Sequence, residues 1–332
     1  MKVLFATYPM AFHTPGGGEI QLLAYQKHLP TYGVEVTLFD PWNPRFLGHD
    51  IVHFFSCVGG STHFCSFVKQ LGLPLVVSSS LWITEQTKQQ YPIDEIRVQL
   101  DLADCVVTNS DMECETLTSL FSLPREKFVT VYNGVDEIFF EEGKPELFRQ
   151  HFGIDGRFIL NVGNIEPRKN QFKLAEAMKA FPDIKLVLIG HARDPEYLEQ
   201  VLQVDGTKVI YLGAIPHDSP LLRSAYKSCE LFVLPSSLET PGLAALEAAA
   251  QGAILVLTRE GSCTEYFGKN AIYVDPFSNE SIRQGINQAL GEGPAARDQN
   301  SMDKYLWSKT LQNLVDTYQT MAAIVNLSRE EK

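Results

Sequence analysis

Several features that mark common function classes are missing from this chain of 332 residues. No two of its six cysteines are separated by two residues, so neither a zinc ribbon nor a dithiol redox motif is present. No uncharged apolar run approaches the roughly 20 residues that a membrane span requires. Basic residues are scarce, because 28 Lys and Arg stand against 40 Asp and Glu, a net charge of −12. Long-range electrostatics therefore oppose binding to nucleic acid, and any anion must be captured locally.

The N-terminal segment and the cysteines both bear on the compartment. Residues 1–9 hold a four-residue apolar core followed by an early proline. That core is too short for a secretory signal, and we interpret it as a first strand. The cysteines lie in apolar runs such as 103–107, as expected for buried thiols in a reducing compartment. We expect a cytoplasmic protein, with weak peripheral association with a membrane as an open alternative.

Short apolar runs alternate with helix-length segments along the whole chain, which is typical of parallel strands joined by crossover helices. The length is sufficient for two domains. The pattern predicts strands in two series: 2–6, 34–39, 50–55, 73–78, 105–109 and 129–132, then 158–162, 185–189, 209–212, 231–234, 253–257 and 271–274.

This pattern predicts two doubly wound, Rossmann-like α/β domains, residues 1–150 and 151–303. Residues 304–332 form a predicted amphipathic helix that crosses back to the first domain. Its apolar positions are Leu306, Leu311, Leu314, Val315 and Tyr318. Because parallel sheets bind ligands at the carboxyl ends of their strands, we expect a site in a cleft between the domains.

A basic turn follows the first strand of the second series. Gly163 allows a sharp exit from the strand, and Arg168 and Lys169 follow at its carboxyl edge, where an anion is expected. The alternative is an exposed basic pair, either solvated or paired with Glu166.

A second anion contact is predicted at 234–252, which has the pattern strand, polar turn, helix. Pro241 suits the first helical position, and Gly252 suits the C-terminal cap. The N–H groups of Gly242, Leu243 and Ala244 would point out of the helix N-terminus, where the macrodipole adds positive charge.

Two carboxylates accompany this helix. Glu239 lies in the preceding loop, and Glu247 lies in a small, apolar helical stretch. Burying Glu247 requires hydrogen-bond donors, which ribose hydroxyls would supply. The alternatives are that Glu247 faces solvent and that Glu239 is only a favourable partner for the helix dipole.

These segments resemble glycosyltransferase family 4, whose members are retaining nucleotide-sugar transferases of the GT-B fold. The resemblance covers most of the chain. Its strongest element is the pair Glu239 and Glu247 in its Pro-Gly-Leu and Leu-Glu-Ala setting. The other matching pieces are 162–170, 188–190, 211–213, 235–236 and 133–136.

The resemblance implies that Arg168 and Lys169 hold the donor diphosphate, that Glu239 lies near the transferred sugar and that Glu247 binds the ribose. It also implies donor contacts from the glycine-rich loop after the first strand, from the loop against the base and from the start of the helix: Gly16, Gly17, Gly18, Gly163, Asn164, Ala214, Ile215, Pro216, Pro241, Gly242 and Leu243.

One departure concerns the acceptor side. Many family members carry a His-Asp pair after the fourth strand, where this chain has serines followed by Leu81 and Trp82. A histidine role cannot be transferred to a serine. The candidate acceptor residues are His53, Ser80 and Trp82, and for His53 a hydrogen-bonded core histidine is the competing interpretation.

The implied reaction moves a sugar, with retention of configuration, from a nucleotide-diphosphate sugar to a hydroxyl of a glycan or lipid-linked acceptor. No Asp-x-Asp pair stands at a suitable strand end, so we expect no metal and no cofactor. The alternatives are a nucleotide-sugar epimerase on the same scaffold and a non-enzymatic two-domain sugar-binding protein. A dehydrogenase is disfavoured because the dinucleotide fingerprint is missing after the first strand.

Overall fold

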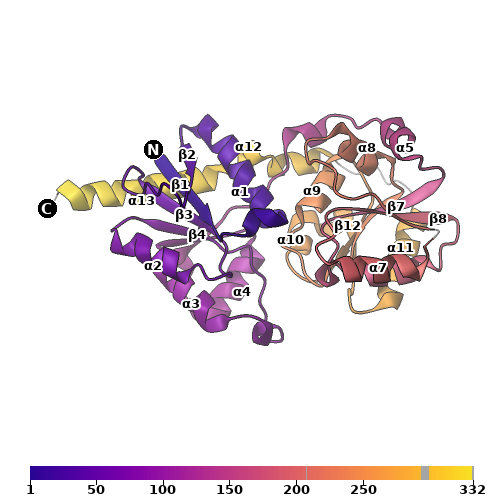
Figure 1. The fold of residues 1–332 in the computed structure, drawn as a ribbon, viewed down its shortest axis with the longest axis horizontal. Helices are drawn as coiled ribbons and strands as arrows, with labels where there is room; N and C mark the ends of the chain where they lie inside the picture. The colour runs from indigo at the N-terminus through magenta and orange to yellow at the C-terminus, as the bar shows by residue number, and fades with distance from the viewer. Residues whose placement is uncertain (207, 293–298, 331–332) are drawn as a thin grey trace. The chain divides into compact units, whose positions relative to one another are not determined.

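The computed structural model describes residues 1–206, 208–292 and 299–330, and the chain divides into two units (Figure 1). The first unit contains Met1–Asn133 and the described chain from Trp307 onward, and the second contains Gly134–Leu306. Each unit is built on one parallel sheet of six strands, so the predicted doubly wound α/β organisation is confirmed.

In the first unit the strand order is β2-β1-β3-β4-β5-β6. All of β3 and β4 is buried, as expected for the central strands of a sheet covered on both faces, whereas the edge strand β2 is largely exposed. The strands are β1 Lys2–Thr7, β2 Glu35–Leu38, β3 Ile51–Phe55, β4 Leu75–Ser78, β5 Cys105–Thr108 and β6 Phe128–Thr130.

Helices cover both faces of this sheet (Figure 1). Helices α2 (Thr62–Gln70), α3 (Ile93–Leu102) and α4 (Asp111–Phe121) pack their apolar side chains on one face. On the other face, α1 (Gly17–His28) and α13 (Gln312–Glu330) meet β3 through the aromatic contacts of Tyr25 with Phe55 and of Tyr318 with His53. Helix α12 (Trp307–Thr310) packs on α1, where Trp307 contacts Tyr25.

In the second unit the order is β12-β11-β10-β7-β8-β9. The strand order reverses between β7 and β10, and such a switch point is where an open α/β sheet leaves a crevice for a ligand. The strands are β7 Arg157–Val162, β8 Ile184–Ile189, β9 Val209–Tyr211, β10 Leu231–Leu234, β11 Leu255–Thr258 and β12 Ala271–Val274.

This sheet is also covered on both faces. Helices α6 (Gln171–Met178), α7 (Pro195–Val204) and α11 (Asn279–Glu292) pack on one face. Helices α5 (Pro145–Phe152) and α8 (Pro220–Ser228) contact the other through Phe148 on Phe158 and Tyr226 on Phe232, and α9 (Leu243–Ala250) packs against β10 and β11. The remaining elements are α10 Cys263–Phe267 and the short helices η1 Ala11–His13, η2 Leu29–Tyr32, η3 Lys88–Gln90, η4 Arg125–Lys127, η5 Glu137–Phe140, η6 Pro167–Lys169, η7 Gly268–Asn270 and η8 Gln299–Tyr305.

The units divide at a different residue from the one the sequence predicts. The predicted boundary is 150, whereas residues from Gly134 onward belong to the second unit. The reason is local packing: Gln251, at the end of α9, donates from Nε2 to the carbonyl oxygens of Phe139 and Glu141 at 2.6 and 2.7 Å. These bonds attach the segment after Asn133 to the second sheet.

The predicted single helix of the tail is interrupted. Residues 299–305 form η8, α12 ends at Thr310, and α13 begins at Gln312. Leu311, Leu314, Val315 and Tyr318 are buried as their spacing predicts. Among the helices in the described part of the chain, none has both the length and the apolar character needed to cross a membrane.

Candidate functional site

The loops that follow β7 and β10 meet at the carboxyl edge of the second sheet. The backbone N–H of Ser237 donates to the carbonyl oxygen of Arg168 at 2.8 Å. Lys169 Nζ lies 2.5 Å from Glu239 Oε1, so side chains join the same two loops. The structure therefore brings together the basic turn and the segment that leads into α9, at the switch point of the sheet.

Lys169 and Glu239 form a buried ion pair, with side chains only 13% and 6% exposed. Burial lowers the pKa of Lys169, and the charge of Glu239 only partly offsets that effect. Burial acts to raise the pKa of Glu239, but the charges of Lys169 and Arg168 outweigh it and hold the pKa below its ordinary value. Glu239 is therefore ionised at neutral pH.

The backbone of Glu239 is fixed by the loop after β11. Its N–H donates to Glu260 O at 3.1 Å, and its carbonyl oxygen accepts from Ser262 N at 2.9 Å. Gly261 makes this approach possible, because its φ is +100° and a Cβ there would lie 1.9 Å from Glu239 O. The carboxylate is consequently held in one place by three loops of the sheet edge.

Arg168 continues the charged cluster. Its Nη2 donates to Glu166 Oε1 at 2.9 Å, and its Nη1 lies 3.3 Å from Leu238 O and 4.0 Å from Glu239 Oε1. The expected alternative of a pair between the basic turn and Glu166 thus applies to Arg168, whereas Lys169 pairs with Glu239. Arg168 keeps 42% of its side chain exposed, so its guanidinium is accessible to a ligand.

Helix α9 begins at Leu243, two residues later than the sequence predicts. Gly242, with φ +86°, occupies the N-cap, and its carbonyl oxygen accepts from Ala245 N at 3.0 Å. The prediction of Pro241 at the first helical position is therefore wrong. A Cβ on Gly242 would lie 3.1 Å from Glu239 Oε2, so glycine lets the carboxylate approach the helix start closely. The first N–H groups of the helix have no partners within the helix, and they lie at this edge of the sheet.

Glu247 is buried inside α9, so the alternative that it faces solvent is wrong. The protein itself supplies two donors: His217 Nε2 lies 2.8 Å from Oε1, and Tyr226 Oη lies 2.7 Å from Oε2. A carboxylate accepts, so both partners donate. His217 and Tyr226 are not predicted from the sequence, because nothing in their spacing relates them to Glu247.

His217 lies in an acidic environment. Burial alone would lower the pKa of His217, but the hydrogen bond and charge of Glu247, with smaller contributions from Asp136 and Asp218, raise it above 6.5.

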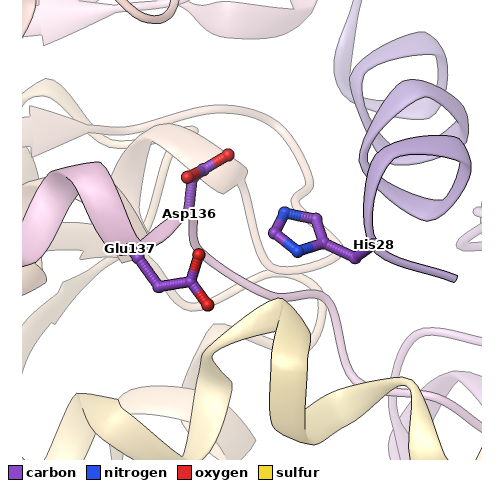
Figure 2. A group of neighbouring side chains, drawn as sticks. All are labelled: His28, Asp136 and Glu137. Atoms are coloured by element: carbon purple, nitrogen blue, oxygen red, sulfur yellow. The ribbon is translucent and has the colours of Figure 1, made fainter. Parts of the chain in front are cut away.

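Figure 2 shows Asp136 and Glu137 at the start of η5, where Asp136 caps the short helix. His28, also drawn there, is the last residue of α1 in the first unit.

The remaining predicted donor residues of the second unit lie along the same sheet edge. Gly163 and Asn164 follow β7, and the Gly163 carbonyl would be 2.0 Å from a Cβ at Gly190, so the loops after β7 and β8 cross closely. After β9 come Ala214 and Pro216, which are exposed, and Ile215, which is half-buried.

The predicted glycine-rich loop of the first unit is largely helical. Gly16 is the N-cap of α1, its N–H donating to Glu19 Oε2 at 2.7 Å, and Gly17 and Gly18 form the first turn. The prediction of a loop there is wrong at these two positions. A Cβ on either Gly17 or Gly18 would meet no heavy atom within 4 Å, so the backbone of this turn is open on that side.

The three candidate acceptor residues differ in placement. His53 is fully buried in β3, bonded to Tyr318 Oη and, at 2.8 Å, to Ser78 Oγ. Burial lowers its pKa to about 3, which favours the interpretation as a core histidine. Ser80 and Trp82 are half-buried in the loop after β4. Ser80 Oγ donates to Gln21 Oε1 at 3.0 Å.

Known proteins are similar to this chain, above all in its second unit. Residues 144–305 match the family model of glycosyl transferases group 1. The chain is 31% identical over 235 residues to an uncharacterized glycosyltransferase of Methanocaldococcus jannaschii, with 64% of this chain and 59% of the relative covered. It is 26% identical over 231 residues to the D-inositol 3-phosphate glycosyltransferase of Mycolicibacterium smegmatis, covering 66% and 53%. The chain thus spans less than two thirds of each relative.

Solved structures share the fold of the whole chain. Sucrose-phosphate synthase from Thermosynechococcus elongatus matches with a TM-score of 0.72 at 18% identity, covering 100% of this chain and 98% of that one. The Anabaena protein HepE in complex with UDP-glucose matches with a TM-score of 0.71 at 18% identity, covering 99% and 100%. The predicted GT-B fold, with its two doubly wound units, is confirmed by these likenesses.

Proposed function

We propose that this protein transfers a sugar, with retention of configuration, from a nucleotide-diphosphate sugar to a hydroxyl of a glycan or lipid-linked acceptor. The observation that carries the proposal is the convergence of Arg168, Lys169 and the start of α9 on one edge of the second sheet. Two cations, of which Lys169 is buried and Arg168 is accessible, together with a helix N-terminus suit a diphosphate. Because the chain carries a net charge of −12, an anion would be attracted by this local positive cluster and not by the chain as a whole.

The proposed chemistry requires charge stabilisation above all. The acceptor oxygen bonds to the anomeric carbon while the bond from that carbon to the diphosphate oxygen breaks. Negative charge grows on the departing oxygen, next to Arg168 and Lys169. That oxygen takes the acceptor's proton, so no base from the protein is needed. Fixed positive groups at a developing oxyanion are among the largest contributions to catalysis, and we propose that no metal is required.

Glu239 and Glu247 would serve the sugar and the ribose. Glu239 is held at the helix start, so it would accept from hydroxyls of the transferred sugar. Each oxygen of Glu247 accepts one protein donor and keeps a further lone pair, which leaves room for ribose hydroxyls. The exposed loop of Ala214 and Pro216 would lie against the base.

The named relatives support this proposal, because they are glycosyltransferases and one structural neighbour holds UDP-glucose. We also propose that the protein acts in the cytoplasm, since all six cysteines are free and five of them are buried. Peripheral contact with a membrane would follow if the acceptor is lipid-linked.

A thermal-shift screen with UDP, GDP, ADP and CMP and their sugar derivatives tests the donor first. A ligand at 100 times its Kd stabilises the fold by about 2.7 kcal/mol. The donor that binds is then incubated with glycan and lipid-linked acceptors, with and without EDTA. Product from the donor alone would indicate an epimerase. Binding of free sugars, without turnover of any nucleotide sugar, would indicate a sugar-binding protein.

A further inference from the structure

Glu166 is a buried carboxylate held between two arginines. It occupies the N-cap of η6 in extended backbone, and its side chain is 11% exposed. Oε1 accepts from Arg168 Nη2 at 2.9 Å, and Oε2 accepts from Arg193 Nη1 at 3.1 Å. Each oxygen therefore bonds to a guanidinium from a different loop, Arg168 from the loop after β7 and Arg193 from the loop after β8.

The backbone keeps these two loops together. Ile165 N donates to His191 O at 2.8 Å, and Asp194 N donates to Ile165 O at 3.2 Å. These bonds lie on either side of Arg193 and directly before Glu166. The geometry of the Arg193–Glu166–Arg168 cluster is thus fixed by main-chain contacts as well as by its own ion pairs.

Arg168 is restrained at both ends of its planar guanidinium. Nη2 is bound to Glu166, and Nη1 faces the carbonyl oxygen of Leu238. A guanidinium restrained in this way has little freedom to rotate, and bidentate recognition of a phosphate depends on such pre-organisation. The two arginines and Glu166 together carry one net positive charge, so the cluster remains attractive to an anion.

We infer that Glu166 is a positioning residue that sets the orientation of Arg168, and that Arg193 completes the cluster by balancing the buried carboxylate, without contacting the donor itself. The inference rests on the proposed function, since Arg168 is there given the diphosphate. It predicts that Glu166 and Arg193 act on catalysis only through Arg168.

A double-mutant cycle with Glu166→Gln and Arg168→Ala tests this. Glu166→Gln keeps the size of the side chain and removes its charge. We expect it to lower kcat roughly tenfold with KM changed less than threefold, because Arg168 is misaligned where the transition-state charge develops. In the Arg168→Ala background it should have no further effect on kcat, since contacting groups are strongly non-additive.

Arg193→Lys and Arg193→Gln form the second arm. Lysine retains the charge and should preserve most of kcat, whereas glutamine should reproduce the loss seen with Glu166→Gln. The matched control is Arg157→Gln, which breaks an ion pair with Glu230 at 3.2 Å at the start of β7. This control should leave kcat unchanged, and circular dichroism melting confirms that each variant is folded.

The same cycle is measured with inorganic pyrophosphate by calorimetry, which needs neither base nor acceptor. A wild type that turns over nucleotide sugars, combined with a Glu166→Gln effect that persists in the Arg168→Ala background, would overturn the inference and leave the proposed function intact. A wild type that binds pyrophosphate with a coupled cycle but turns over no nucleotide sugar would support the inference and reject the proposed function. Absence of pyrophosphate binding and of turnover would reject both.

Discussion

The carboxyl edges of the two sheets differ in charge although the sheets have the same number of parallel strands. In the first unit, amide and hydroxyl side chains form a network at the edge. Gln21 Nε2 donates to Asn109 Oδ1 at 2.7 Å, Asn109 Nδ2 donates to Ser80 Oγ at 3.1 Å, and Ser80 Oγ donates back to Gln21. In the second unit the edge is ionic, with Lys169 on Glu239 and two arginines on Glu166.

The difference lies in the segments that follow the strands, and not in the sheets themselves. Amides and hydroxyls suit neutral polyols, because they exchange hydrogen bonds without bringing net charge. Arginine and lysine suit phosphates. The single carboxylate of the first network, Glu113, is fully buried and accepts from Ser79 Oγ and two backbone N–H groups. It organises the loops after β4 and β5 and is not available to a ligand.

The largest effect is expected from a substitution in the charged edge of the second sheet. Lys169→Ala removes the more buried of the two cations proposed to face the departing phosphate, and we expect kcat to fall about 100- to 1000-fold. Steady-state kinetics with the donor found in the screen provides the measurement. Lys179→Ala, at the exposed end of α6, serves as the control and should behave as wild type. Wild-type turnover by Lys169→Ala would remove the leaving-group argument.

Glu247→Ala should weaken binding of the nucleoside diphosphate by about 1 to 3 kcal/mol, roughly 5- to 150-fold in Kd, if buried hydroxyl pairing is lost. Calorimetry with the nucleoside diphosphate measures this change, and Glu199→Ala on the exposed face of α7 is the matched control. Because His217 and Tyr226 lose their acceptor, the melting temperature should also fall. An unchanged Kd would reject the ribose assignment.

The first unit should respond to acid through His53. Its pKa of about 3 in the folded state lies below the unfolded value near 6.5. Between these two values His53 is therefore protonated in the unfolded chain and neutral in the folded chain. Stability is then lost as pH falls from 6.5 toward 3, by about 1.4 kcal/mol per pH unit. His53→Gln should flatten this slope in denaturant unfolding between pH 4.5 and 7, whereas His63→Gln on the surface of α2 should not. An equally steep slope in His53→Gln would contradict the assignment.

The smallest expected effect concerns His217 in the second unit, which changes the stability with pH in the direction opposite to His53. Because the folded pKa of His217 is raised, its ion pair with Glu247 contributes fully below pH 6.5 and is lost as pH rises through the folded pKa. His217→Gln should therefore lower the melting temperature at pH 6 and approach wild type at pH 8.5. A difference from wild type that stays constant across this range would show that the pair does not titrate.

Much of the fold is predictable from the sequence, and the contacts of the site are less so. Apolar runs locate the twelve strands of the described chain. Central strands such as β3 and β4 require such runs because both of their faces are buried. The start of α9 is missed because a glycine at positive φ displaces a favourable proline. The sequence predicts that a buried Glu247 needs hydrogen-bond donors. It does not predict that His217 and Tyr226 are those donors, because only tertiary packing brings them to Glu247. Gly17 and Gly18 suggest a loop, whereas Glu19 supports a helix start.

The most direct test of the central claim is a crystal structure with the nucleoside diphosphate that gives the largest thermal shift. We expect phosphate oxygens within about 3 Å of Lys169 Nζ or the Arg168 guanidinium, and of a backbone N–H at Gly242 or Leu243. A nucleotide bound elsewhere, with η6 and the start of α9 untouched, would contradict it.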